Sequence, residues 1–361
     1  MKKICFIIPN LGGGGAERVA THLLNNLDLK KYDLTLIIMY KDKGDYLDKL
    51  RKEVKVEFLN VDRIRFGILS IFKFLKKNNF DLVMVFSEDI MIFIGIFVAP
   101  FIKNTMFINR HLSVFLGNKK SIFRKYSSKL AYKGYDKVIS QSKDMTESLI
   151  KNGLVSKNKI TEINNPVDFE NLEVLSNRQE KLEFDKNSKN IIAVGRLFYQ
   201  KGFDILINSM QSLKDENIKL FILGEGKERG NLEKLIKNLQ LEDKVFLIGR
   251  KSNPYVYMKN CDLFILSSRY EGFPNVLLEA NACGCYAICN NSPGGINEII
   301  QENINGNIID FENKKIFSET IKRELIKNHD KEKIKNMIKN RYSLKTIINK
   351  YEEYLDNIKT N

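Results

Sequence analysis

Residues 4–27 read ICFIIPNLGGGGAERVATHLLNNL, and this stretch decides the fold class. Residues 4–9 are a short apolar run of the kind that forms a buried strand. Glycines fill positions 12–15, and apolar residues then recur at helical spacing over residues 16–27. The apolar helical positions are Val19, Leu23, Leu24 and Leu27. A strand, a glycine loop and a helix in this order predict the opening of a parallel α/β sheet.

The same alternation of apolar strands and helices continues along the chain. In the first half we expect strands at residues 34–40, 54–59, 82–86, 105–109 and 137–140. A helix is expected at residues 68–77. A turn-rich, polar break follows Asn164. Beyond it we expect strands at residues 191–194, 219–223, 244–248, 263–266 and 286–289. Such alternation is typical of parallel sheets that helices cover on both faces.

We therefore predict an α/β protein of two doubly wound domains, residues 1–165 and 166–340. Ligands of doubly wound sheets lie at the carboxyl ends of the strands. Two such domains facing each other would enclose one interdomain cleft. A last helix is expected at residues 342–358, where apolar residues again recur at helical spacing.

The composition supports two cores and a basic first domain. The chain has 361 residues, of which 43% are hydrophobic, so global disorder is excluded. Of the net charge of +15, residues 1–165 carry nearly all, with 29 basic and 16 acidic residues. A one-sided basic surface favours a polyanionic partner. We expect no nucleic-acid partner, because the second domain is nearly neutral and no nucleic-acid-binding motif is present.

The sequence favours a cytoplasmic setting. The five cysteines are an odd number without a repeated paired spacing, which indicates a reducing compartment. Lys2 and Lys3 lead straight into the first strand, so we expect no signal peptide. The most lipid-like run, residues 90–102, is shorter than the roughly 20 residues of a spanning helix, and we expect a buried helix there.

The glycine loop at residues 12–15 is the first motif that suggests chemistry. Glycines before a helix let backbone N–H groups approach a phosphate, and the helix terminus adds partial positive charge. A plain tight turn is the alternative. A dinucleotide fingerprint is not met, because Glu17 stands where its third glycine belongs, so we expect no hydride transfer.

Two cations form the second motif. Arg196 and Lys201 lie five residues apart in the loop that follows the first strand of the second domain. A guanidinium and an ammonium group in such a loop can neutralise a diphosphate. The alternative is a solvated basic loop, but the position at the carboxyl end of a strand favours binding.

The third motif, residues 271–279, is the most specific. Gly272 and Pro274 shape a turn between a strand and a helix, and Glu271 and Glu279 frame that turn. Backbone N–H groups at the start of the helix are expected to bind an anion or sugar hydroxyls. Those groups belong to Phe273, Asn275 and Val276. The alternative is a capped surface helix with an incidental glutamate at each end.

Together these motifs resemble the retaining nucleotide-sugar glycosyltransferases of family 4, whose GT-B fold has two facing Rossmann-like domains. The matching segments are Gly14-Gly15-Ala16-Glu17-Arg18, Gly195-Arg196-Leu197 with Lys201-Gly202, Leu223-Gly224-Glu225-Gly226, and Glu271-Gly272-Phe273-Pro274-Asn275 with Glu279. Their order spans almost the whole chain. Tyr286 departs from the pattern, since the family often has proline there.

The resemblance implies a role for each matching residue. Arg196 and Lys201 would hold the donor diphosphate, Glu271 would contact the transferred sugar, and Glu279 would bind the ribose. Further donor contacts would come from Gly14, Gly15, Gly272, Phe273, Asn275 and Val276. His111 matches the family's active-site histidine, which hydrogen-bonds the sugar. The resemblance also implies that a C-terminal helix, residues 341–361, packs back on an acceptor-binding first domain.

We expect neither a metal nor another cofactor. No Asp-x-Asp pattern is present, which disfavours a metal-dependent reaction, and the nucleotide sugar is a substrate. Cys283, Cys285 and Cys289 lie close in sequence, but no histidine is near them. Buried cysteines are therefore a better interpretation than a zinc site.

Two stretches of the first domain combine basic and apolar residues. They are residues 63–77 and residues 118–134, and the second contains no acidic residue. Such surfaces suit an anionic membrane, where each Lys or Arg near the surface adds about 1 kcal/mol. A solvated helix face is the alternative. Membrane binding would place the protein on the inner face of the cytoplasmic membrane and would fit a polyprenyl-linked acceptor.

The predicted function is the retaining transfer of a hexose or N-acetylhexosamine from a nucleotide-diphosphate sugar, with UDP as the expected nucleotide. The acceptor would be a glycan or lipid-linked glycan of bacterial surface polysaccharide, lipopolysaccharide or glycoprotein assembly. Two alternatives remain open at this stage. One is another GT-B enzyme, either a phosphorylase or a hydrolysing epimerase, and the other is a non-catalytic module that binds membranes.

Overall fold

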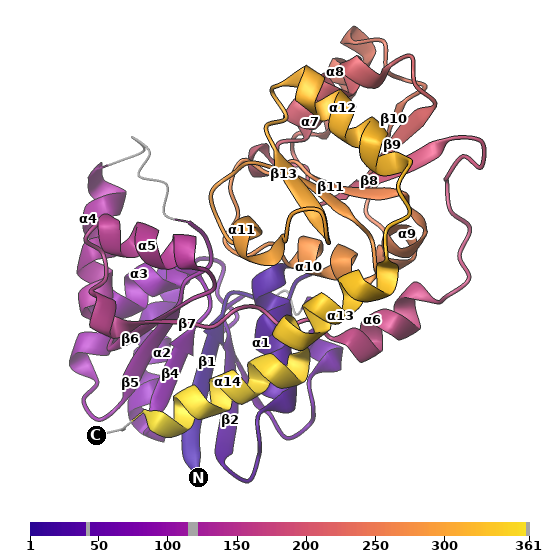
Figure 1. Ribbon diagram of the computed structural model, residues 1–361. Helices are drawn as coiled ribbons and strands as arrows, with labels where there is room; N and C mark the ends of the chain where they lie inside the picture. Colours follow the sequence, from indigo (N-terminus) through magenta and orange to yellow (C-terminus); the bar gives the residue numbers. More distant parts are fainter. Residues whose placement is uncertain (41–43, 115–121, 359–361) are drawn as a thin grey trace. The chain divides into compact units, whose positions relative to one another are not determined.

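The computed structural model describes residues 1–40, 44–114 and 122–358, and it divides the chain into two compact units. Unit 1 comprises Met1–Pro166 and Leu344–Asn361, and unit 2 comprises Val167–Ser343. Each unit has a wholly parallel sheet with helices on its faces (Figure 1). This architecture confirms the predicted class of two α/β domains.

The sheet of unit 1 has seven strands in the order β3-β2-β1-β4-β5-β6-β7. The strands are β1 (Lys2–Ile8), β2 (Tyr32–Ile38), β3 (Lys55–Phe58), β4 (Leu82–Val85), β5 (Met106–Arg110), β6 (Lys137–Ser140) and β7 (Ile160–Glu162). The chain moves outward from β1 in one direction and then from β4 in the other. The carboxyl ends of β1 and β4 therefore flank the topological switch point, where doubly wound sheets bind ligands.

The helices of unit 1 cover both faces of that sheet. They are α1 (Gly15–Asn26), α2 (Ile64–Asn78), α3 (Glu88–Phe97), α4 (Ile122–Lys133), α5 (Lys143–Lys151) and α14 (Leu344–Asn357). Short 3₁₀ turns are η1 (Leu47–Lys49), η2 (Ala99–Phe101) and η3 (Lys157–Lys159). One apolar core joins α1 and α14 to one face, and another joins α2, α3 and α4 to the opposite face.

The last helix, α14, packs on unit 1 although it follows unit 2 in sequence (Figure 1). Its buried residues face the core that α1 also covers. Lys2 Nζ donates to the carbonyl oxygens of Leu355 and Ile358, at 2.6 and 2.9 Å, and so places a cation at the carboxyl end of the helix. The single helix predicted at residues 342–358 is wrong in its start: α13 (Lys331–Tyr342) ends first, and Ser343, with a ψ of 152°, is not helical and separates it from α14.

Unit 2 has a six-stranded sheet in the order β10-β9-β8-β11-β12-β13. Its strands are β8 (Lys189–Val194), β9 (Ile218–Leu223), β10 (Val245–Leu247), β11 (Leu263–Leu266), β12 (Ala287–Asn290) and β13 (Gly306–Ile309). Numbered within the unit, this is the order 3-2-1-4-5-6 of dinucleotide-binding folds. The switch point of unit 2 therefore lies between β8 and β11.

The helices of unit 2 follow its strands in alternation. They are α6 (Phe169–Ser176), α7 (Phe203–Met210), α8 (Arg229–Asn238), α9 (Tyr255–Asn260), α10 (Asn275–Ala282), α11 (Ile296–Ile299), α12 (Lys314–Leu325) and α13. The 3₁₀ turns are η4 (Tyr199–Lys201) and η5 (Gln211–Leu213). Two apolar cores fill the two faces of the sheet.

Two predictions for unit 1 need correction. The helix predicted at residues 68–77 begins earlier, at Ile64, because Arg63 is extended and the apolar helical spacing already holds from there. Residues 90–102 are not one buried helix: α3 ends at Phe97 and η2 follows, and Phe97 and Phe101 are exposed. Within the described residues, no helix is long and apolar enough to cross a membrane.

Candidate functional site

The loops that follow β8 and β11 meet at the switch point of unit 2. Lys201, at the end of η4 in the first loop, lies beside Glu271 in the second, with 2.6 Å between Nζ and Oε1. The side chains are only 18% and 8% exposed, so both charges are largely withdrawn from water. Ser268 Oγ donates to the same carboxylate oxygen at 2.6 Å. The two residues that the sequence named separately therefore form one preorganised ion pair.

The backbone around Lys201 fixes the position of its side chain. Gly202 has a φ of 63°, and a Cβ there would overlap the carbonyl oxygen of Ser267. Ser267 Oγ in turn donates to the Lys201 carbonyl oxygen at 2.8 Å. A Cβ at Gly195 would lie 3.4 Å from the Lys201 methylene groups, so the lysine side chain runs directly beside this glycine. Glycine is needed at position 202 because other residues rarely adopt this left-handed conformation.

Arg196 presents a second cation beside this loop. Its guanidinium lies 5.0 Å from the ring centre of Phe198, and Lys227 Nζ lies 5.7 Å from the same ring. Arg196 is exposed, and across the described part of the chain it has no carboxylate partner. Lys227, which follows the Gly224-Glu225-Gly226 turn, was missed by the sequence analysis. Arg196 and Lys227 thus both lie beside the Phe198 ring, and Lys201 is a third cation of the loop that follows β8.

Segment 293–295 supports the backbone of Glu271 and Gly272 through two hydrogen bonds. The Glu271 amide donates to the Pro293 carbonyl oxygen at 3.0 Å, and the Gly295 amide donates to the Gly272 carbonyl oxygen at 2.9 Å. Gly294 has a φ of 127°, and a Cβ there would overlap the Glu271 carbonyl oxygen. The contact of this segment with Glu271 was not predicted from the sequence. Its glycines permit a close backbone approach that only the fold reveals.

A second ion pair ties the same two loops together. Arg269 donates to both carboxylate oxygens of Asp204, at 2.8 and 2.6 Å, and its guanidinium stacks 4.0 Å from the Tyr199 ring centre. The Arg269 guanidinium holds the pKa of Asp204 below its usual value, although burial opposes this. Bidentate pairs fix geometry more firmly than single bonds. The sequence analysis also missed this Arg269–Asp204 clamp, because the spacing of the two residues along the chain matches no motif.

The predicted donor-binding residues at residues 272–279 lie at the start of α10. The Phe273 side chain is buried and packs edge-on against Tyr342 at 5.5 Å, so only its backbone could meet a ligand. Glu279 is buried in the second turn of α10, where it already interacts with other groups of the protein. Ligand contacts by Gly272, Phe273, Asn275, Val276 and Glu279 stay predictions.

In unit 1, Gly14 and Gly15 begin α1, as the sequence predicts for a helix-opening loop. A Cβ at Gly14 would overlap the carboxylate of Glu17, which folds back over the first turn. Glu17 is the third residue of the helix, where a glutamate commonly caps the terminal amides. A phosphate that bound at this helix terminus would therefore have to displace a carboxylate of the chain itself.

His111 directly follows β5 and lies on the ligand edge of the unit 1 sheet. Its Nδ1 is 2.9 Å from Tyr132 Oη, whereas Nε2 is buried and has no hydrogen-bond partner among the described residues. Burial lowers the pKa of His111 below 6.5, and the nearby Glu88 partly opposes the shift. Glu88 also accepts a hydrogen bond from Ser113. A neutral imidazole with one unsatisfied nitrogen is ready to bind a hydroxyl group.

This burial predicts a pH dependence of stability. Because the folded pKa of His111 lies below its unfolded value, the unfolded chain takes up a proton first as the pH falls. The free energy of unfolding should therefore drop below about pH 6.5. His111→Gln should flatten the fall in melting temperature between about pH 7.5 and 5.5. Some slope should remain, since burial also lowers the pKa of His329. An unchanged slope would contradict a buried, neutral His111.

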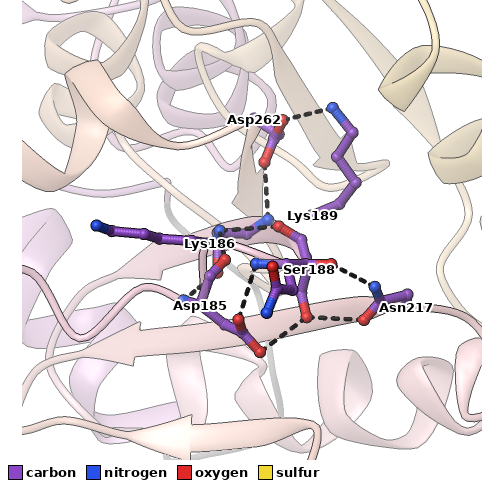
Figure 2. Close-up of a pocket in the computed structure, with 8 residues that line it drawn as sticks. Asp185, Lys186, Ser188, Lys189, Asn217 and Asp262 are labelled. Carbon is purple, nitrogen blue, oxygen red and sulfur yellow. Dashed lines mark hydrogen bonds and ion pairs between the residues drawn. The ribbon is translucent and has the colours of Figure 1, made fainter.

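One hollow of the described structure lies away from these loops. It has a volume of about 550 Å³ and sits at the amino end of β8 (Figure 2). Its polar side chains bind one another: Ser188 Oγ donates to Asn217 at 2.7 Å, and Lys189 Nζ pairs with Asp262 at 3.0 Å. Hydrogen bonding to Lys219 lowers the pKa of Asp185 to about 2. Since ligands of such sheets bind at the opposite, carboxyl edge, this hollow is not the candidate site.

Metal ligands do not cluster in the described residues: no group of three or more His, Cys, Asp or Glu side chains could hold an ion. All five cysteines are free and buried, which confirms the burial expected for Cys283, Cys285 and Cys289.

Two family models match the chain. The model described as "Glycosyltransferase Family 4" matches residues 13–171, and the one described as "Glycosyl transferases group 1" matches residues 176–344. Together they cover most of both units and all the predicted site residues.

Among curated proteins, one similar relative is N-acetylgalactosamine-N,N'-diacetylbacillosaminyl-diphospho-undecaprenol 4-alpha-N-acetylgalactosaminyltransferase from Campylobacter jejuni. It is 32% identical, over 94% of this chain and 95% of its own. The amylovoran biosynthesis glycosyltransferase AmsD of Erwinia amylovora is 25% identical, over 88% of each chain. Among solved structures, Anabaena HepE in complex with UDP and glucose superposes with a TM-score of 0.82 at 19% identity, over 99% of this chain and all of that one.

Proposed function

Because this chain belongs to glycosyltransferase family 4, we propose that it transfers a hexose or N-acetylhexosamine from a UDP-sugar to a lipid-linked glycan. The reaction would retain the anomeric configuration and serve the assembly of a bacterial surface glycan. The Lys201–Glu271 pair at the switch point of unit 2 carries this proposal. The Campylobacter relative's undecaprenol-linked acceptor and the UDP complex of HepE support the substrate classes.

The charges in unit 2 suit a diphosphate leaving group. Negative charge grows on the diphosphate as its bond to the sugar breaks, so fixed cations contribute most in the transition state. A lysine ammonium has three N–H donors, and Lys201 uses one of them on Glu271. The others, with the exposed guanidinium of Arg196, are available for phosphate oxygens. These cations could replace a divalent metal, so we propose a metal-independent reaction that chelators do not inhibit.

Glu271 and His111 would act on the transferred sugar. In this proposal Glu271 accepts a hydrogen bond from a sugar hydroxyl while Lys201 and Ser268 hold the carboxylate in place. The unsatisfied Nε2 of His111 binds another hydroxyl. Glu279 binds the ribose, and the amides near Phe273 and Asn275 meet the sugar and phosphate. We propose that the acceptor attacks the same face of the sugar that the diphosphate leaves, without a protein nucleophile, because the Glu271 carboxylate already binds Lys201 and Ser268.

The two units would divide the substrates between them. Unit 2 would bind the UDP-sugar, since its switch point holds the cations. Unit 1 would bind the acceptor, while its glycine loop at Gly14 and Gly15 would add contacts to the donor diphosphate. A lipid-linked acceptor lies at a membrane surface, and we propose that unit 1 makes the contact with that surface.

Melting curves with a panel of nucleotide sugars test the donor. UDP and one UDP-hexose or UDP-N-acetylhexosamine should raise the melting temperature by several degrees, since a ligand at about 100 times its Kd adds about 2.7 kcal/mol. GDP-mannose should give no shift. The UDP shift should shrink in Arg196→Ala and persist with a chelator. A response to GDP-sugars alone, or a shift that a chelator removes, would contradict the proposal.

A further inference from the structure

We propose that the outer face of α2, α3, η2 and α4 docks onto an anionic lipid bilayer, with apolar side chains entering the headgroup region. This deepens the proposed function, because it rests on a lipid-linked acceptor and names the partner that unit 1 meets. We call this face the α2–α4 surface. Its apolar members are Phe66, Leu69, Phe97, Phe101, Tyr126 and Leu130.

The α2–α4 surface concentrates the exposed apolar side chains of the described residues. Its six apolar members are each 52–69% exposed. They make up most of the large hydrophobic residues that the described part of the chain exposes, and the others are scattered over both units. Single exposed apolar residues are ordinary, but a contiguous group marks an interaction site.

Helix packing brings these residues onto one surface. α3 packs against both α2 and α4, and all three helices bury their opposite sides in the same core (Figure 1). The backbones of α3 and α4 approach closely at Gly95, where a Cβ would overlap the Ala131 carbonyl oxygen. In α2 the buried Gly67, Ile71 and Leu75 recur every four residues, so Phe66 and Leu69 point away from the core.

Positive charge surrounds the apolar group. Exposed cations on the three helices and the turn after η2 are Arg65, Lys73, Lys76, Lys77, Lys103, Lys125, Lys129 and Lys133. The exposed acidic residues of the same segments are Asp62, before α2, and Asp89, at the start of α3. Residues 115–121, which hold Lys119 and Lys120 of the predicted basic stretch, lie outside the described residues.

This combination fits an anionic bilayer better than other partners. Basic side chains are attracted to acidic headgroups, while Phe, Tyr and Leu gain by entering the boundary between headgroups and acyl chains. A nucleic acid would use the cations and aromatic rings but would leave Leu69 and Leu130 in water. A neutral apolar protein partner would leave the cations without counter-charges. Charge complementarity therefore selects the anionic bilayer.

The test is co-sedimentation of the full chain with vesicles of phosphatidylcholine alone or mixed with phosphatidylglycerol. The wild type should bind only the mixed vesicles at low salt, and high salt should weaken binding. Phe97→Ser/Phe101→Ser should lower the partition coefficient at least tenfold, because the variant loses the apolar area that the two phenylalanines would bury in the bilayer. The matched control is Ile316→Ser/Ile326→Ser, which removes two exposed apolar residues of unit 2 and should bind like the wild type.

Charge is tested by a second matched pair of variants. Lys73→Glu/Lys76→Glu on α2 should lower the partition coefficient at least tenfold. Lys234→Glu/Lys237→Glu makes the same charge change on the exposed face of α8 in unit 2 and should have little effect. Equal loss in both pairs would mean that only net charge matters, and this would overturn the proposal. Failure of the wild type to bind mixed vesicles, or stronger binding to RNA, would also overturn it.

The donor shift separates this inference from the proposed function. All four variants should keep the wild-type melting temperature and its UDP-sugar shift, because their substitutions are exposed and lie outside the donor site. Vesicle binding without any nucleotide-sugar shift would refute the proposed donor and leave the docking surface standing. A normal donor shift without vesicle binding would refute only the docking surface.

Discussion

Lys201→Ala is expected to lower kcat for sugar transfer by about a hundredfold to a thousandfold, the range seen when one preorganised charge-stabilising group is removed. The fold holds the Lys201 cation in one position at the switch point of unit 2. Its Nζ lies 2.6 Å from Glu271, and its backbone is fixed by Gly202 and Ser267. Initial-rate measurements with a UDP-sugar and a lipid-linked acceptor would test the loss.

The same substitution leaves the Glu271 carboxylate buried with only Ser268 beside it, so the melting temperature should also fall. Lys201→Ala/Glu271→Gln removes that unpaired charge. It should recover most of the lost stability and none of the activity. Recovery of activity in the double variant would mean that Lys201 serves only to neutralise Glu271.

Lys219→Ala is the matched control. Lys219 Nζ also lies 2.6 Å from a carboxylate, that of Asp185, and the pair is in the same unit at the amino edge of the sheet. Breaking it should leave kcat within about twofold of the wild type, because surface pairs contribute little and this one is remote from the carboxyl edge. Equal losses in the two variants would show that the effect of Lys201 is general destabilisation.

The alternation of apolar runs was enough to predict both sheets. In a parallel sheet covered on both faces, strands such as β4 and β11 are buried on both sides and read as unbroken apolar segments. The motifs at Arg196–Lys201 and Glu271 could also be found, because glycines and prolines mark the loops. Strand order was needed to see that these loops adjoin, since β8 and β11 are neighbours across the switch point.

Features that depend on tertiary neighbours could not be predicted. The Arg269–Asp204 clamp joins side chains of ordinary helix and loop residues, and only the adjacency of their loops makes them partners. Residues 90–102 are apolar throughout, so periodicity could not tell which side of the segment the core would cover. Phe97 and Phe101 are exposed because α3 turns its glycine side to α4.

Arg110, at the edge of the candidate site, is another residue whose surroundings could not be predicted from the sequence. It ends β5 directly before His111 and is 1% exposed. It donates from Nε to Tyr351 Oη of α14 at 2.9 Å, donates from Nη2 to Asn165 Oδ1, and lies over the Phe86 ring. Nothing in the sequence separates this buried arginine from the exposed ones nearby. Its two hydrogen-bond partners come from the end of the first chain segment of unit 1 and from α14.

Gly294→Ala is expected to reduce activity at least a hundredfold and to lower the melting temperature by several degrees. The φ of Gly294 is 127°, which other residues rarely adopt, and its Cβ would overlap the Glu271 carbonyl oxygen. That oxygen belongs to the backbone and cannot rotate away as a side chain would. Segment 293–295 must therefore shift and, through the Glu271–Pro293 hydrogen bond, move the carboxylate away from Lys201. A misplacement of about 1 Å can cost a hundredfold in rate.

Gly153→Ala separates local strain from damage to the site. Gly153 also has a positive φ, 64°, but no atom lies within 4 Å of the Cβ it would gain. Alanine there should cost about 1–2 kcal/mol of stability and leave kcat unchanged. Activity and melting curves of the two variants, measured side by side, distinguish the cases. If Gly294→Ala lost stability alone and kept its kcat, segment 293–295 would support the fold without positioning Glu271, and the assignment of Glu271 to the transferred sugar would lose its structural basis.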